Sequence, residues 1–138
     1  MCFYIHNKHL KEKTAERDIT CYKVFSSRDI NGNQHGKYIR SYYRSFNYKF
    51  GTRYELDGYI NPILGAKGDP YMINVGLHSY TSLEKAKKVI QGMASYYKKI
   101  IIPCVIPKGS KYYHNPGDRE YVSDQIIIGK FNQIIKPQ

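Results

Sequence analysis

The chain has few acidic residues and only three cysteines, and each scarcity argues against a class of protein. Cys2, Cys21 and Cys104 form no Cys-x-x-Cys pair, and an odd number of thiols cannot all be paired. A reducing, cytoplasmic setting is therefore expected rather than a disulfide framework or a zinc knuckle. The N-terminal lysines precede no apolar run of the kind found in signal peptides. No segment reaches the roughly 18 apolar residues of a membrane-spanning helix, so we expect no membrane association.

Basic residues outnumber acidic ones, 22 to 11, which gives a formal net charge of +11. Such a surplus attracts phosphates and other anions at low salt. A second interpretation is compositional, because lysine, isoleucine, asparagine and tyrosine share AT-rich codons and most of the basic residues are lysine, whereas phosphate readers favour arginine. Both interpretations stay open. The scattered carboxylates predict neither a metal site nor a catalytic carboxylate pair.

The length of 138 residues is typical of a single domain with one hydrophobic core, and no internal repeat divides residues 1–138. Residues 1–17 form a charged lead-in, in which Met1–Ile5 is a candidate edge strand. Isoleucine and tyrosine dominate the apolar residues, and both favour strands because they fit a pleated surface.

Alternation predicts a strand at Ile19–Phe25, with Cys21, Lys23 and Phe25 on one face. Residues 38–54 predict one or two strands broken at Gly51. The other expectations are a loop over 62–70, strands over 71–78, 99–106, 121–128 and 131–135, a type I turn over 107–110 and a turn over 115–118.

One segment has helical periodicity. Thr81 and Glu84 have the spacing of a capping box, and apolar residues recur at helical spacing up to Tyr97, which predicts a helix over about 82–97. Strands, one helix and more strands predict an α+β domain with a mainly antiparallel, strongly twisted sheet and one principal helix.

The candidate ligand site lies where residues 76–82 join a strand to this helix. Free amides and the helix dipole at such a point favour anions. We expect His78, Ser79, Thr81 and Ser82 to bind an anion there, with charge partners at two further positions, Lys23 and Arg44. The alternative is structural, with Thr81 as a helix cap and His78 as an internal histidine.

Residues 38–54 offer a second candidate surface, because they interleave arginines with tyrosines. Bases stack on tyrosine rings and arginines bind phosphates, which is how single strands are held without sequence readout. The alternative is an amphipathic hairpin with half-buried tyrosines. The sequence contains no helix-turn-helix, zinc or ribonucleoprotein motif.

Most of the chain, from about residue 18 to 128, resembles a family of short, uncharacterised bacterial and bacteriophage proteins. The resemblance is carried by four blocks: Cys21-Tyr22-Lys23-Val24, Gly76-Leu77-His78-Ser79-Tyr80, Cys104 to Tyr113 (CVIPKGSKYY) and Tyr121-Val122-Ser123-Asp124. It implies a phage or mobile-element origin and no particular reaction.

A second resemblance is to the ADP-ribosyltransferase core. Residues 79–82 (Ser-Tyr-Thr-Ser) are similar to its middle motif, and residues 106–109 (Ile-Pro-Lys-Gly) resemble a strand and turn near its end. The resemblance implies NAD as the group bound, with Tyr80 and Glu120 as catalytic residues. The Arg or His of the first strand of that core is absent from residues 19–25, so a degenerate fold kept for binding is an equal alternative.

Together these observations favour a small, basic binding module for an anionic, nucleotide-type ligand. The alternatives are an NAD-dependent ADP-ribosyltransferase-like enzyme and a protein that binds nucleic acid or a host protein.

Overall fold

The computed structural model describes residues 3–4, 11–26, 38–41, 47–64, 70–92 and 99–135. Its helices are α2 (Leu83–Gln91) and a short 3-10 helix, η1 (Phe131–Gln133). Its strands are β1 (Phe3–Tyr4), β2 (Lys13–Thr14), β3 (Ile19–Ser26), β4 (Tyr38–Ser41), β5 (Asn47–Lys49), β6 (Arg53–Glu55), β7 (Asn61–Leu64), β8 (Pro70–Val75), β9 (Leu77–Tyr80), β10 (Lys99–Ile106), β11 (Lys111–Asn115), β12 (Glu120–Ser123) and β13 (Gln125–Ile128).

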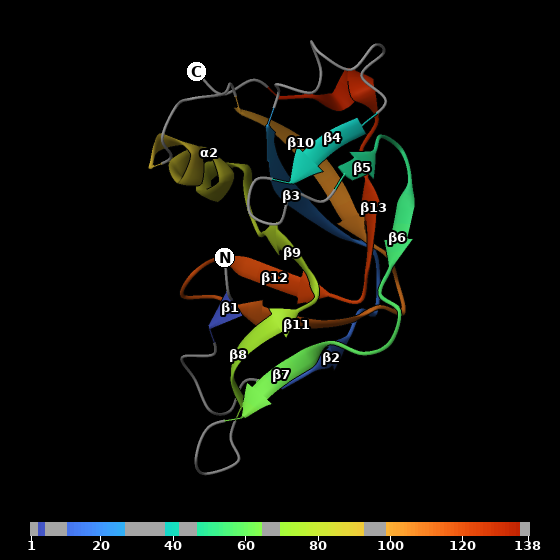
Figure 1. Ribbon diagram of the computed structural model, residues 1–138, viewed down its shortest axis with the longest axis vertical. Coiled ribbons are helices and arrows are strands. Elements are labelled where there is room, and N and C mark those ends of the chain that lie inside the picture. Colours follow the sequence, from blue (N-terminus) through green and yellow to red (C-terminus); the bar gives the residue numbers. More distant parts are fainter. Residues whose placement is uncertain are drawn as a thin grey trace.

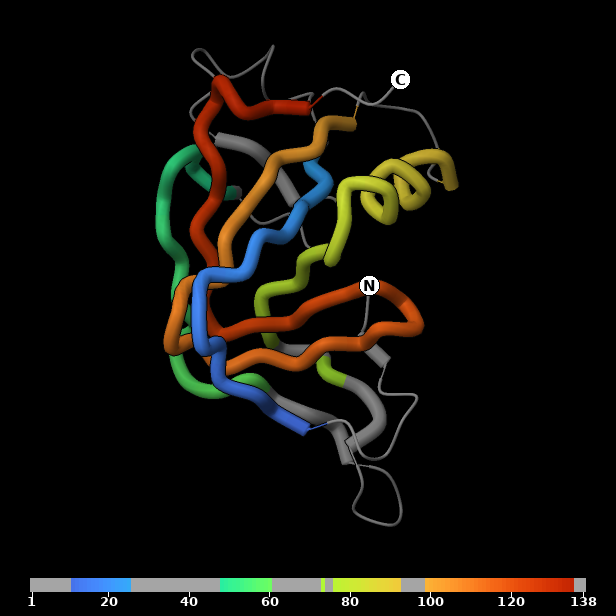
Figure 2. Tube along the Cα trace, turned by 180° about the vertical axis from the view of Figure 1, so that it is seen from behind, coloured from blue at the N-terminus to red at the C-terminus, as the bar shows by residue number. Residues whose placement is uncertain are grey.

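The strands form two sheets, and every strand pair within them is antiparallel (Figure 1). The larger sheet has the order β2-β11-β12-β9-β3-β10-β13-β6, with β4 paired to β3 and to β5, and the smaller has the order β1-β8-β7. Figure 2 shows β3, β10 and β13 side by side, with the β11–β12 hairpin crossing below them and α2 to one side. The predicted α+β class with a mainly antiparallel sheet is confirmed; its strong twist stays a prediction.

The two central strands are buried on both faces, and this creates two cores. Strand β3 pairs with β10 over eight residues, from Lys99↔Ser26 to Ile106↔Ile19. The face predicted from alternation is confirmed, since Cys21, Lys23 and Phe25 are all buried. We call this the inner face, and its core consists of Cys21, Phe25, Tyr48, Ile100, Ile102, Cys104, Ile106, Ile126 and Ile128.

The opposite face of β3 and β10 is covered by α2, and we call it the helix face. Its core is smaller and consists of Val24, Tyr80, Ala86 and Ile101. A third cluster joins the smaller sheet to the β11–β12 hairpin through Ile60, Ile73, Tyr113 and Val122. The site described below lies at the edge of the helix face.

The cap of the helix differs from the predicted one. Ser82, in extended conformation, is the N-cap, and its Oγ accepts a hydrogen bond from the Lys85 amide at 3.1 Å. The predicted Thr81–Glu84 capping box is therefore wrong, because the chain enters the helix one residue later. Helix α2 ends at Gln91, with Gly92 as its C-cap, and not at residue 97; residues 93–98 lie outside the described part of the chain.

The predicted loop over residues 62–70 is wrong at its start, because Asn61–Leu64 forms β7. The proline of β7 is tolerated since β7 is an edge strand of the smaller sheet, where a missing amide hydrogen breaks no ladder. Residues 65–69 lie outside the described part. Likewise, residues 38–54 contain three strands, β4, β5 and β6, in place of the predicted one or two.

The predicted strand over residues 71–78 is divided at Gly76 into β8 and β9, which belong to different sheets. A Cβ at Gly76 would lie 2.2 Å from Cγ2 of Val122, a distance that no side chain could adopt. Glycine is therefore needed here for the close approach of β12, and it lets the chain cross from one sheet to the other.

Two further expectations need correction. The turn over residues 107–110 is present, with the Ser110 amide bonded to the Pro107 oxygen, but Gly109 has a φ of 89°, which is the i+2 geometry of a type II turn and not type I. The strand over 121–128 is interrupted at Asp124, whose carboxylate accepts from the Lys111 amide at 2.9 Å and fixes a bend.

The end of the described chain is also not the predicted strand. The segment 131–135 forms η1 followed by one isolated bridge, Ile135 to Ile101. The 3-10 helix η1 begins after Lys130, where the Gln133 Oε1 accepts a hydrogen bond from the Lys130 amide at 2.7 Å. In the described residues, none of the helices has the length and apolar character needed to cross a membrane.

Candidate functional site

Strand β9 divides the residues expected to form one ligand site between the two faces of the sheet. Successive side chains of a strand point to opposite faces. Tyr80 is the register partner of Glu120, and His78 that of Val122, so these side chains share the helix face. Ser79 points to the inner face, on which Lys23 lies. The strand geometry therefore brings together Tyr80, His78 and Glu120 and separates them from Ser79 and Lys23.

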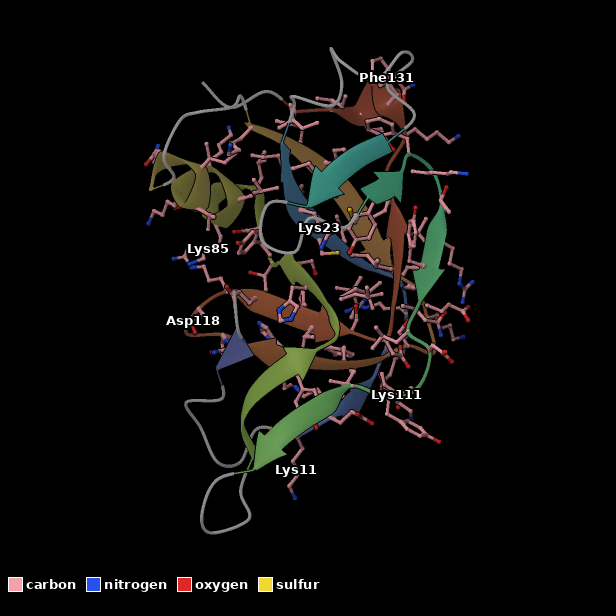
Figure 3. The ribbon with its side chains drawn as sticks, viewed as in Figure 1. Lys11, Lys23, Lys85, Lys111, Asp118 and Phe131 are labelled. Carbon is pink, nitrogen blue, oxygen red and sulfur yellow. The ribbon has the colours of Figure 1, made fainter. Side chains whose placement is uncertain are left out.

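Lys23 is an internal lysine with contacts of its own, and only 6% of its surface is exposed. Its Nζ donates a hydrogen bond to the backbone oxygen of His78. It also lies 5.1 Å from the ring centroid of Tyr48 and 6.0 Å from that of Phe25 (Figure 3). Burial lowers the pKa of Lys23. The ammonium expected to face a ligand is instead directed into the inner core.

Ser79 lies in the same interior. Its side chain is buried against Cys21, and burial raises the pKa of the Cys21 thiol to about 11 against the opposing effects of the Ser79 hydroxyl and the Lys23 charge. Burial also raises the pKa of the Cys104 thiol. These groups form a polar cluster under the sheet, away from the start of α2.

The start of α2 uses its two hydroxyl residues for structure. The Ser82 hydroxyl caps the helix, and the Thr81 amide donates to the Arg119 oxygen at 2.9 Å, which ties the helix start to the β11–β12 turn. Leu83 and Glu84 are the first two residues of α2, and the first amides of a helix have no acceptor within the helix. These are the N-terminal helix amides that attract anions.

Glu120 is the most unusual group on the helix face. It is a buried carboxyl group, with only 5% of its surface exposed. Burial, with a further contribution from the charge of Asp118, raises its pKa to about 7, and Lys85 acts in the opposite direction. A buried carboxyl group that titrates near neutrality has the property of a general acid or base.

The hairpin turn and the helix deliver the charges around Glu120. The Asn115 Oδ1 accepts hydrogen bonds from the amides of Gly117 and Asp118, at 3.1 and 3.4 Å, and the Asn115 Nδ2 donates to the Asp118 carboxylate at 3.0 Å. Arg119 follows with a φ of 53°, a conformation that non-glycine residues rarely adopt. Figure 3 shows Lys85 extending from α2 toward the turn that carries Asp118.

Sequence reasoning found Tyr80 and Glu120 but missed Lys85, Asp118 and Arg119. Helical periodicity alone places Lys85 on the outer side of the helix. The turn over residues 115–118 was predicted. The signal that could have linked this turn to the site is that Glu120 lies two residues after it.

The tyrosine-rich stretch does not present its described aromatic rings for base stacking. Tyr48 is buried, with its ring 5.6 Å from Phe25 and 4.9 Å from Tyr54. Phe50 is half-buried against Phe131 at 5.4 Å. Arg44, the second expected charge partner, lies outside the described residues.

No metal centre is visible in the described ranges, where no three His, Cys, Asp or Glu residues are grouped as metal ligands would be. No protein-family model, curated protein or solved structure matches the chain. The two family resemblances therefore stay predictions.

Proposed function

We propose that this chain is a binding module for an anionic, nucleotide-type ligand, held between the start of α2 and the start of β12. The observation that carries the proposal is Glu120, a buried carboxyl group with a pKa near 7 whose charge interacts with Lys85 in the first turn of α2. A ligand that donates a hydrogen bond to this carboxyl group would offset part of the cost of its burial.

The surroundings of Glu120 suit a ligand with two chemically different ends. The amides of Leu83 and Glu84 and the ammonium of Lys85 suit a phosphate. Glu120 suits a hydroxyl donor, since a carboxylate accepts hydrogen bonds from a ribose diol. A phosphate joined to a polyhydroxyl group describes a nucleotide or a sugar phosphate. The net charge of +11 supports an anionic ligand as well.

A thermal-shift screen tests the proposal at low and at moderate salt. The panel contains NAD, ADP-ribose, mono- and cyclic nucleotides, and single- and double-stranded oligonucleotides. A ligand at one hundred times its Kd adds about 2.7 kcal/mol to the free energy of unfolding. At about 3–4 °C per kcal/mol for a domain of this size, that corresponds to roughly 9 °C in Tm.

Two matched variants locate the site. Lys85→Gln should reduce the nucleotide-induced shift, whereas Lys87→Gln, which removes the same charge from the exposed side of α2, should not. If both variants lost the same part of the nucleotide-induced shift, the shift would depend on net charge and not on a site at Lys85. Stabilisation by oligonucleotides alone, lost as salt rises, would instead support nucleic-acid binding.

A second candidate function is NAD-dependent ADP-ribosyl transfer, and the observation that favours it is the register pairing of Tyr80 with Glu120. In that reaction the bond between the nicotinamide nitrogen and the ribose carbon breaks, nicotinamide leaves, and an acceptor nucleophile binds the same carbon. Glu120 would take the proton of the acceptor. Nicotinamide release from NAD tests this, and release that is unchanged in Glu120→Gln would exclude Glu120 from the reaction.

The setting of the molecule is part of the proposal. The free thiols of Cys21 and Cys104 support a reducing, cytoplasmic environment. We retain a phage or mobile-element origin, and a host protein as the alternative partner, from the sequence resemblance. Co-purification from cell extract, with Glu120→Gln as the control, tests for such a partner when the ligand screen gives no stabilisation.

A further inference from the structure

Two free thiols face each other across the centre of the sheet, and the proposed ligand site uses neither of them. Cys21 on β3 and Cys104 on β10 are register partners, and both belong to the inner-face core. They are 0% and 1% exposed. Two thiols at paired positions differ from a single buried cysteine because they can form a disulfide with each other.

The phase of the ladder between β3 and β10 sets the distance between the two residues. Ile101 directs both its amide and its carbonyl toward Ile135, at 2.9 and 2.8 Å, and so away from β3. Pro103, two residues along, is oriented the same way, which suits a residue without an amide hydrogen. Cys104 therefore directs its backbone toward β3, and Cys21↔Cys104 is a hydrogen-bonded pair with Cα atoms about 5.5 Å apart.

That separation lies at the commonest Cα distance in disulfides, about 5.5–6 Å. Antiparallel partners also point their side chains to the same face, so both sulfur atoms lie on the inner face. In a hydrogen-bonded pair the Cβ atoms lie about 5.5 Å apart, beyond the roughly 3.5–4.5 Å of a relaxed disulfide, so joining the thiols strains the two strands locally and gives a bond that is easily reduced.

Lys23 provides a base beside the thiols. It lies two residues from Cys21 on the same face, and its charge interacts with both thiols. Burial lowers the pKa of this amine, so more of it is neutral than in an exposed lysine; burial also raises the pKa of the thiols, so the proton passes to the amine as the sulfur attacks and not before.

We propose that Cys21 and Cys104 form a reversible, peroxide-driven disulfide, with Lys23 as the base. The Lys23 amine takes the proton of the Cys21 thiol as the sulfur attacks hydrogen peroxide to give a sulfenic acid. The hydroxide that leaves takes the proton back and becomes water. The Cys104 thiol, deprotonated in the same way, attacks the sulfenic sulfur and releases a second water.

The balance is two thiols and one peroxide to one disulfide and two waters. Hydrogen peroxide is close in size to water, which suits a buried site. In a reducing compartment such a bond is transient and acts as a sensor, since thiol reductants reopen it.

Intact-mass spectrometry tests the proposal on the full chain carrying Cys2→Ser, so that only two thiols remain. After reduction, peroxide treatment and acid quenching, the expected result is a loss of 2 Da that dithiothreitol reverses. A digest without reductant should contain one cross-linked peptide joining Cys21 to Cys104. Two alkylatable thiols after unfolding, or addition of oxygen without a cross-link, would each overturn the proposal.

The role of Lys23 is tested in the same background with Lys23→Met, which keeps the apolar stem and removes the amine. The disulfide should form at least about tenfold more slowly, since a general base contributes 10²–10⁴-fold in rate. Lys99→Met is the matched control, because it removes another buried lysine from the neighbouring strand. An equal rate in Lys23→Met and in the parent would remove Lys23 from the reaction.

Discussion

The inner face and the helix face of the central sheet both bury ionisable groups, but they do so in opposite ways. On the inner face, Lys23 has a carbonyl oxygen and two aromatic rings as partners, and its pKa is lowered. On the helix face, Glu120 lies among the charges of Asp118 and Lys85, and burial raises its pKa to about 7. The contrast is between a lysine with identified contacts in the core and a carboxyl group at which we propose that a ligand binds.

The same contrast appears in the packing. The inner core joins strands β3, β10 and β13 with Tyr48 of β5, whereas the helix-face core of the described residues consists of Ala86 of α2 and three buried residues beneath it. A site that binds ligands needs some local freedom, and freedom is found where few apolar groups are buried. The predictions below test this division, from the largest expected effect to the smallest.

Truncation of adjacent residues on β10 compares the two cores directly. Ile102 belongs to the inner core and Ile101 to the helix-face core, and both are 0% exposed. Ile→Ala in a core costs about 2–5 kcal/mol, and we expect Ile102→Ala at the upper end and Ile101→Ala at the lower end of this range. Urea unfolding of both variants measures the difference. A larger loss in Ile101→Ala would contradict the division.

The pH dependence of stability should depend on Glu120. A carboxyl group whose pKa is raised from 4.5 to about 7 binds more protons in the folded chain than in the unfolded chain between those values. The contribution of Glu120 to the free energy of unfolding is therefore fully present below pH 4.5. It falls by about 2–3 kcal/mol as the pH rises from 4.5 to 7. Glu120→Gln should remove this slope in urea unfolding curves taken across that range. An unchanged slope would assign it to another group.

On the inner face, Lys23→Met should leave stability unchanged or raise it by about 1 kcal/mol, because the buried charge is replaced by an apolar chain of similar shape. The pKa of Lys23 is lowered from 10.5, so in the parent its contribution makes stability rise with pH as the pH approaches 10.5. The difference in unfolding free energy between parent and variant should therefore change across that alkaline range. A large loss of stability at neutral pH would mean that the ammonium contacts hold the core together.

The smallest effect is expected at the β11–β12 turn. Arg119 has a φ of 53°, and Arg119→Gly removes that strain, along with an exposed 3.9 Å ion pair to Glu84 that contributes little. We expect a gain of less than about 1 kcal/mol. Thermal unfolding measures it, and a clear loss of stability would show that the ion pair outweighs the strain.

The sequence predicted the parts of this fold that depend on local pattern. Alternation identified the buried face of β3, and the run of apolar residues identified the bounds of β10. The turn at Pro107 was located, but its type depended on the φ of Gly109. The helix cap was displaced by one residue because Thr81 and Ser82 are both good caps, and only the tertiary bond from the Thr81 amide to Arg119 decides between them.

The candidate site was predicted in part, because its residues come together through register and not through sequence proximity. Tyr80 and Glu120 are 40 residues apart and meet across β9 and β12. The alternation that puts His78 and Tyr80 on one face necessarily puts Ser79 on the other, which a list of consecutive polar residues does not reveal. Lys85 and Asp118 come near Glu120 only because α2 packs beside the β11–β12 hairpin. The sequence has no local signal for this packing.

Amide chemical-shift mapping with ADP-ribose tests the central claim most directly, namely that the ligand binds on the helix face at Glu120. We expect shifts that saturate with ligand and are largest for residues 80–86 and 118–121, with little change at Cys21 and Lys23. The same titration of Glu120→Gln should show weaker binding. Saturable shifts centred on residues 47–55 or on the inner face, or identical binding by the variant, would contradict the account.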